Sequence, residues 1–153
     1  MVCPMKLTSV QRAPLWSGTA LQGLLGIGSP GERIGEDLVL AVHSAADTGE
    51  PDCRVENGMF AGMRLRDVPG VPDPFPLLIK LIDAGEDLSL QVHPSDPGTE
   101  GGEKTEMWLI LHAEPGARLL YGLRPEVSCA DFCRSVRAGC FDMSLCRSVP
   151  VRA

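Results

Sequence analysis

This chain has few aromatic residues and lacks long apolar runs. Only 5% of its 153 residues are Phe, Trp or Tyr, so the core must be built mainly from Leu, Val and Ile. The apolar run at residues 77–79 ends at Lys80, and no apolar run in the chain approaches the ~20 residues that cross a bilayer. No secretion-type apolar stretch follows Lys6 and Arg12 near the N-terminus. We therefore expect a soluble cytoplasmic protein without a membrane segment.

The chain also lacks an excess of positive charge. Lys and Arg number 14 against 20 Asp and Glu, which gives a net charge of −6, and no basic stripe is present. Nucleic-acid binding normally needs such a stripe to neutralise phosphates, so we expect no nucleic-acid partner. An anionic small molecule would have to be attracted by local cations and not by the net charge.

Paired C-x2-C knuckles, typical of structural zinc sites, are absent as well. Four of the six cysteines crowd the last 25 residues with the spacing C-x3-C-x6-C-x5-C: Cys129, Cys133, Cys140 and Cys146. With no secretion signal, this spacing favours free thiols. A structural metal cluster and a redox or disulfide role are the alternatives.

The composition favours a small β-rich fold. Gly (17) and Pro (13) are frequent and dispersed, which indicates short strands and turns. Hydrophobic residues at 44% and charged residues at 22% are typical of globular proteins, and the length predicts one domain over residues 1–153. We expect a β-sandwich or barrel with a few short helices.

Apolar patterning predicts the individual elements. Strands are expected over residues 36–43, 77–83, 88–93, 106–112 and 117–121. Asn57-Gly58 is a hairpin-type turn signal, and the Pro-rich segment 67–76 is expected to be a connector. Ser128 and Asp131 resemble a capping box that starts a helix over about residues 129–138, before Gly139.

A glycine-rich segment matches a dinucleotide-binding fingerprint by letter only. Gly26, Gly28 and Gly31 have the G-x-G-x-x-G spacing. The fingerprint needs a strand before it and a helix opening at its third glycine, whereas Pro30 and Gly35 disfavour a helix here. We therefore expect a glycine-rich loop, with a dinucleotide site as the weaker alternative.

The segment with the most chemical information is Leu88–His93. Side chains alternate along a strand, so Gln91 and His93 would share one face, about 7 Å apart, with an amide oxygen and an imidazole. Glu106 opens the next apolar strand, and Lys104 precedes it by two residues. Such donors could bind a divalent metal. On spacing alone the metal signal is weak, and the pattern favours a surface glutamine, a capping histidine and an exposed glutamate.

Several motifs together resemble type I mannose-6-phosphate isomerase, a zinc-dependent family with the cupin fold. They are Gln91-Val92-His93-Pro94, Gly101-Gly102-Glu103-Lys104-Thr105-Glu106-Met107-Trp108, Tyr121-Gly122-Leu123, Ile34-Gly35-Glu36, Val55-x-Asn57-Gly58-x-Phe60-x-Gly62 and Phe75-Pro76-Leu77-Leu78-Ile79-Lys80. The resemblance covers roughly residues 12–151, as an N-terminal part of the family's sequence. It implies a mainly β, cupin-like jelly roll or β-sandwich.

The resemblance also implies a function for individual residues. Gln91, His93 and Glu106 match three of the family's four zinc ligands, and Lys104 matches an active-site lysine that contacts the substrate. Family members interconvert mannose 6-phosphate and fructose 6-phosphate by moving a proton between C1 and C2 through an enediol-like intermediate. The implied cofactor is one Zn²⁺ ion, and the implied partner is a small-molecule sugar phosphate. Neither the native divalent metal, nor the proton-transfer base, nor the oligomeric state is specified by the sequence.

The sequence departs from the family pattern in informative places. The family continues with G-D-x-x-x-x-P-A-G-x-x-H-A, whose histidine is the fourth ligand, but this chain ends at Ala153. An arginine farther along the family sequence has no counterpart either. Asp37-Leu38 replaces Ser-Trp, and Trp16-Ser17-Gly18 replaces Trp-Gly-Gly. We expect a domain incomplete at its C-terminus, with impaired activity; a non-catalytic cupin-like module that binds metal or sugar phosphate is the alternative.

Overall fold

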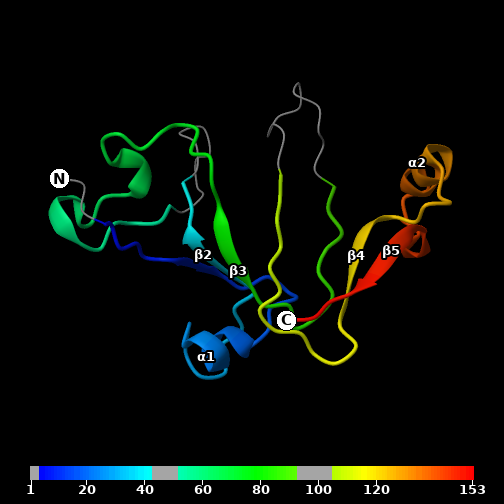
Figure 1. Ribbon diagram of the computed structural model, residues 1–153, viewed down its shortest axis with the longest axis horizontal. Coiled ribbons are helices and arrows are strands. Elements are labelled where there is room, and N and C mark those ends of the chain that lie inside the picture. Colours follow the sequence, from blue (N-terminus) through cyan, green and yellow to red (C-terminus); the bar gives the residue numbers. More distant parts are fainter. Residues whose placement is uncertain (1–3, 43–51, 93–104) are drawn as a thin grey trace. The chain divides into compact units, whose positions relative to one another are not determined.

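The computed structural model describes residues 4–42, 52–92 and 105–153 (Figure 1). The described chain is mainly β, with antiparallel sheets and a few short helices, as expected, and is consistent with a small β-rich cupin-like domain. It divides into two compact units, Met1–Ser89 and Leu90–Ala153. The single domain over residues 1–153 stays a prediction.

The first unit contains a three-stranded antiparallel sheet in the order β1-β2-β3. The strands are β1 (Val10–Arg12), β2 (Glu36–Leu40) and β3 (Ile79–Ile82), and β2 lies centrally (Figure 1). The strands predicted over 36–43 and 77–83 are thus confirmed with shorter bounds. β1 was not predicted, because three residues are too few for a periodic pattern.

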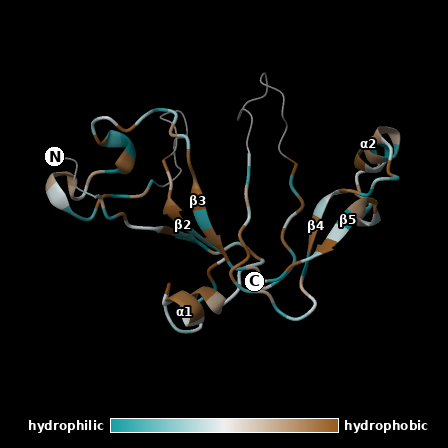
Figure 2. Cartoon of the chain, in the orientation of Figure 1, coloured by the Kyte–Doolittle hydropathy of each residue, from teal (hydrophilic) through white to brown (hydrophobic). Residues whose placement is uncertain are grey.

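Aliphatic side chains form the core of this unit, as the scarcity of aromatics predicts. One cluster is centred on Leu38 and Cys53, and a second on Val55, Leu65 and Val68; all five are buried. Figure 2 shows hydrophobic stretches along β2 and β3, and the first cluster joins Leu38 of β2 to Cys53, with Val10 of β1 packed against them. Full burial of a Val or Leu side chain contributes roughly 1.5–3 kcal/mol, so these clusters hold the sheet and the following loops together.

Helix α1 (Ala20–Leu25) is positioned by a residue from the end of β3. The Asp83 carboxylate accepts hydrogen bonds from the backbone N–H groups of Ala20 (2.5 Å) and Leu21 (3.1 Å). These donors have no partner within the helix, so Asp83 caps it from 63 residues away. At the other end, Gly26 adopts the left-handed conformation (φ +69°) and ends the helix.

The Asn57-Gly58 signal lies in a turn, as predicted. Segments 53–55 and 63–65 run antiparallel, with Val55 N–H donating to Met63 O (3.0 Å) and Gly62 N–H donating to Val55 O (2.7 Å). The connection is longer than two residues and includes the 3-10 turn η1 (Gly58–Phe60), with Gly58 at φ +72°. A second 3-10 turn, η2 (Leu65–Asp67), follows. The Pro-rich segment after it carries no strand, as expected.

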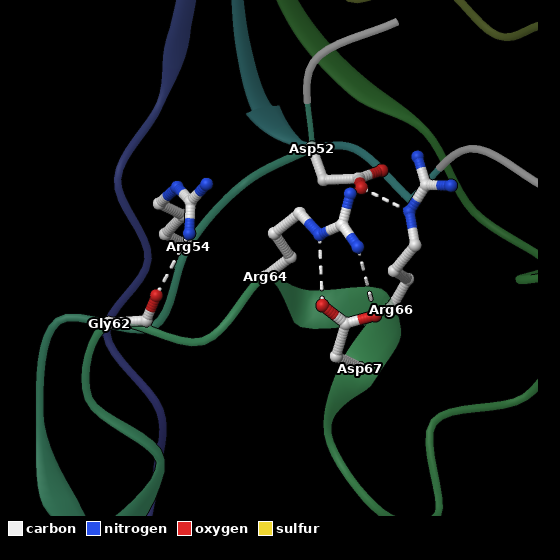
Figure 3. A network of polar contacts seen from close by, with 6 residues as sticks. All are labelled: Asp52, Arg54, Gly62, Arg64, Arg66 and Asp67. Atoms are coloured by element: carbon white, nitrogen blue, oxygen red, sulfur yellow. Dashed lines mark hydrogen bonds and ion pairs between the residues drawn. The ribbon is translucent and has the colours of Figure 1, made fainter. Parts of the chain in front are cut away.

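Charged side chains in and next to this hairpin form a network of polar contacts (Figure 3). Arg66 is paired with Asp52, whose side chain is almost fully buried. Arg64 forms two hydrogen bonds with Asp67, at 2.9 and 3.4 Å, and Arg54 donates to Gly62 O (2.9 Å). A buried carboxylate needs such a partner, so the Asp52–Arg66 pair has a structural role in the unit.

The second unit contains a two-stranded antiparallel sheet and a capped helix. β4 (Arg118–Leu123) pairs with β5 (Cys146–Pro150), and α2 (Cys129–Arg137) and the 3-10 turn η3 (Met143–Leu145) lie between them in sequence. The strand predicted over 117–121 and the helix predicted over 129–138 are confirmed. The capping box is present: Ser128 Oγ accepts from Asp131 N–H (3.1 Å), and Ser128 N–H donates to the Asp131 carboxylate (3.2 Å).

Two predicted strands do not form in the described residues. Residues 88–92 and 105–112 carry no strand, so the strand predictions over 88–93 and 106–112 are wrong for that part of the chain. Alternation of apolar and polar residues defines a face that can be buried, but it does not supply a neighbouring strand to complete the hydrogen-bond ladder. Residues 88–92 and 105–112 therefore have a sequence pattern typical of strands but do not pair with a neighbouring strand.

In the described parts of the chain, no helix combines the length and the apolar character needed to cross a bilayer.

Candidate metal site

Two of the four predicted site residues lie in the described part of the chain. Gln91 and Glu106 belong to the second unit, and both are exposed. Each takes part in a polar or electrostatic interaction. His93 and Lys104 lie outside the described residues. The convergence of Gln91, His93 and Glu106 on one point therefore stays a prediction.

The chain on either side of Gln91 lies against an apolar groove. Leu90 and Val92 line this groove of about 340 Å³ together with residues from α2, from η3 and from the segment between them: Phe132, Val136, Gly139, Phe141 and Met143. The rings of Phe132 and Phe141 meet edge to face, with centroids 5.7 Å apart.

The donor set fits a divalent metal by its chemistry. An amide oxygen, an imidazole nitrogen and a carboxylate oxygen are borderline-hard ligands suited to zinc and similar ions. Gln91 and Glu106 are accessible, as a metal exchanging with solvent requires. No group of three or more His, Cys, Asp or Glu residues suited to a metal occurs within residues 4–42, 52–92 and 105–153. This absence does not bear on the predicted set, because Gln91 is not one of these four residue types and His93 lies outside the described residues.

His112 is the histidine among the described residues. Its Nε2 lies 3.4 Å from the carboxylate of Glu114, and both side chains are exposed. Nothing in this surface pair indicates a metal ligand.

Asp37 is a buried polar residue that the sequence pattern marked only as a departure from the family motif. It lies in β2, is 1% exposed, and its Oδ1 atom has no hydrogen-bond partner in the described part of the structure. Burying an unpartnered carboxylate oxygen costs stability. The signal available in the sequence was the acidic residue directly before the apolar run Leu38–Val42.

The glycine-rich segment has no dinucleotide-site geometry. Helix α1 precedes it, and no helix opens at Gly31, where residues 31–35 form a turn and a bridge. The expected glycine-rich loop is confirmed. A phosphate-binding helix N-terminus is missing from this part of the described chain.

Comparison with known proteins reveals clear relatives. The chain is 38% identical to a protein of Bacillus subtilis (strain 168) named "Probable mannose-6-phosphate isomerase GmuF", over 80% of this chain. It is 35% identical to mannose-6-phosphate isomerase ManA of the same organism over 78% of this chain. It is 31% identical to the mannose-6-phosphate isomerase of Streptococcus mutans serotype c over 100% of this chain.

The chain is a relative of the mannose-6-phosphate isomerases. The resemblance inferred from the motifs is thereby confirmed. The chain spans 42%, 40% and 50% of the lengths of the three relatives, about half or less of each. No family model matches the chain. No solved structure matches it with significance.

Proposed function

We propose that the chain contributes the metal-binding part of a mannose-6-phosphate isomerase, which interconverts mannose 6-phosphate and fructose 6-phosphate. The single observation that carries this proposal is the similarity to relatives named mannose-6-phosphate isomerase over 78–100% of the chain. The motif with Gln91, His93, Lys104 and Glu106 lies within the resemblance. The polar donors are accessible to solvent, which suits a catalytic metal site better than a structural one.

In this proposal Gln91, His93 and Glu106 hold one Zn²⁺ ion. When bound by these residues, Zn²⁺ would supply Lewis-acid chemistry, which polarises oxygen atoms and stabilises developing negative charge. Lys104 is the residue that contacts the substrate, and a lysine point charge suits an anionic sugar phosphate in a chain with a net charge of −6. The carboxylate of Glu106 offsets part of the metal's charge. The amide of Gln91 supplies a neutral oxygen.

Residues 1–153 alone are proposed to turn over substrate more slowly than the relatives. The family's fourth ligand and its later arginine have no counterpart among these residues, and three protein ligands hold zinc less firmly than four. A non-catalytic metal-binding or sugar-phosphate-binding module is the alternative that the same measurements test.

The decisive experiment measures retained metal and turnover on the same samples. The protein is loaded with zinc, dialysed and assayed for metal by mass spectrometry. A coupled assay then follows fructose 6-phosphate formed from mannose 6-phosphate, with B. subtilis ManA in parallel. Gln91→Ala, His93→Ala and Glu106→Ala should each lose most of the retained zinc. Glu126→Gln, which removes an exposed carboxylate paired with Arg124 in the same unit, should retain it.

The outcomes separate the readings. Retained zinc with slow turnover supports the isomerase proposal, and retained zinc without turnover supports the binding module. If the three variants keep as much zinc as the Glu126→Gln control, the proposed ligand set is wrong. Turnover equal to that of ManA would disprove the impairment.

A further inference from the structure

Two cysteines lie one turn apart on the same face of α2. Cys129 is the first residue of the helix and Cys133 is the fifth; Cys129 is exposed, Cys133 is half-buried, and both are free thiols. Residues four apart on a helix are neighbours, with Cβ atoms about 5–6 Å from each other. The two thiols therefore form a preorganised pair at a surface that a ligand can reach.

The spacing selects what this pair can bind. A disulfide needs Cβ atoms about 3.5–4.5 Å apart, so residues in this helical register are too distant for a direct bond without distorting α2. One atom placed between the sulfurs adds the missing length. Thiols prefer soft, polarizable partners, which points to a single thiophilic atom with two exchangeable positions.

The surroundings favour a ligand with an apolar group. Cys129 and Cys133 share the apolar stripe of α2 with Phe132 and Val136, at positions i, i+3, i+4 and i+7. Phe132 and Val136 also line the apolar groove beside Leu90 and Val92. An aryl or alkyl substituent on the bound atom could therefore lie along apolar side chains.

We propose that Cys129 and Cys133 form a dithiol site that chelates one soft thiophilic centre, of the class of trivalent organoarsenicals and soft metal ions. With phenylarsine oxide, two S–As bonds form, both thiols lose their protons, and the arsenic-bound oxygen leaves as water. No atom changes oxidation state, so no oxidant or reductant is needed. The site is independent of the proposed isomerase function.

The test uses phenylarsine oxide on the reduced full chain, with intact mass spectrometry after challenge by a monothiol or a dithiol. We expect one equivalent to survive 2-mercaptoethanol and to be removed by dithiothreitol. A second thiol at a short fixed distance acts at millimolar effective concentration, so Cys129→Ser or Cys133→Ser should weaken retention about a hundredfold or more. Cys140→Ser, which removes a neighbouring exposed thiol, should leave retention unchanged.

A respaced variant tests the geometry itself. Cys133→Ser combined with Arg134→Cys keeps the number of thiols but turns the second one away from Cys129, so retention should be lost. Far-UV circular dichroism checks that each variant keeps its helix, and Cys133→Ala serves as a second removal of the thiol. Equal retention by Cys129→Ser, by Cys133→Ser or by the respaced variant would overturn the proposal. So would loss of retention in Cys140→Ser.

Discussion

The contact between Gly18 and Asp83 gives the sharpest test of how the first unit is held together. A Cβ atom added at Gly18 would collide with the Asp83 carboxylate, which caps α1 through the N–H groups of Ala20 and Leu21. Gly18 does not have a positive φ, so the backbone itself would accept alanine. The predicted cost of Gly18→Ala therefore comes from displacing the cap.

The structure sets the size of the effect. Loss of an N-cap side chain costs about 0.5–2 kcal/mol, and a hydrogen bond to a charged group contributes about 1.5–3 kcal/mol. Asp83 makes two such bonds while partly exposed, so we expect Asp83→Ala to cost about 2 kcal/mol. For a chain of this length that corresponds to a fall in Tm of about 4–8 °C. Gly18→Ala alone should cost about the same.

A double-mutant cycle decides whether the two residues act through this contact. In the Asp83→Ala background the carboxylate is gone, so Gly18→Ala should be close to neutral, giving a coupling of more than about 1 kcal/mol. Independent sites add to within about 0.3–0.5 kcal/mol. Urea unfolding of the four proteins, followed by circular dichroism, measures the coupling. Additive costs would refute the tertiary cap, and Asp83→Asn, which keeps an acceptor oxygen, should lose less than Asp83→Ala.

Two further predictions concern ionisation. Hydrogen bonds from Ser128 hold the pKa of the Asp131 carboxyl below its ordinary value, so the cap stabilises α2 above about pH 3.9 and is lost as the pH falls through the lowered pKa. Ser128→Ala should move the acid midpoint of the helical circular dichroism signal to higher pH; an unchanged midpoint would contradict this. Burial raises the pKa of the Cys53 thiol, so stability should fall above about pH 8.5, where the unfolded thiol ionises first. A thiol reagent should modify exposed Cys140 at once but reach Cys53 only in denaturant, and rapid native labelling of Cys53 would count against its burial.

Local signals in the sequence predicted local structure well. The α2 helix could be predicted because Ser128, Asp131 and Gly139 mark its ends within twelve residues. β2 could be predicted from its contiguous apolar residues, and β3 from an apolar segment that only Lys80 interrupts. β1 and α1 could not, because a three-residue strand is defined by its partner β2, and α1 is capped by Asp83, far away in sequence. Neither long-range contact leaves a pattern in the neighbouring residues.

The candidate site shows the same division between local and long-range information. The motif supplied Gln91, His93, Lys104 and Glu106 as residue types, and the relatives support the family to which that motif belongs. The strands expected around these residues need pairing partners, which an alternating pattern does not specify. Residues 88–92 and 105–112 form no strand. The sequence thus names candidate ligands, which stay a prediction, whereas the strands expected to carry them do not form in the described residues.

The motifs that carry the resemblance have two physically different roles. In the first unit they solve packing problems: a Cβ at Gly35 would lie 2.6 Å from Ser17 Oγ, and Asn57 Oδ1 accepts from Lys6 N–H at 2.7 Å. These residues could be shared by any protein with this frame, whatever it binds. Gln91 and Glu106 are exposed and do not belong to the buried core, so substitutions at these positions should leave the stability of the fold largely unchanged. If variants of Gln91 or Glu106 lose metal but keep their stability, the result therefore concerns function alone. If a Gly35 variant loses both metal and stability, the result concerns only the packing of the fold.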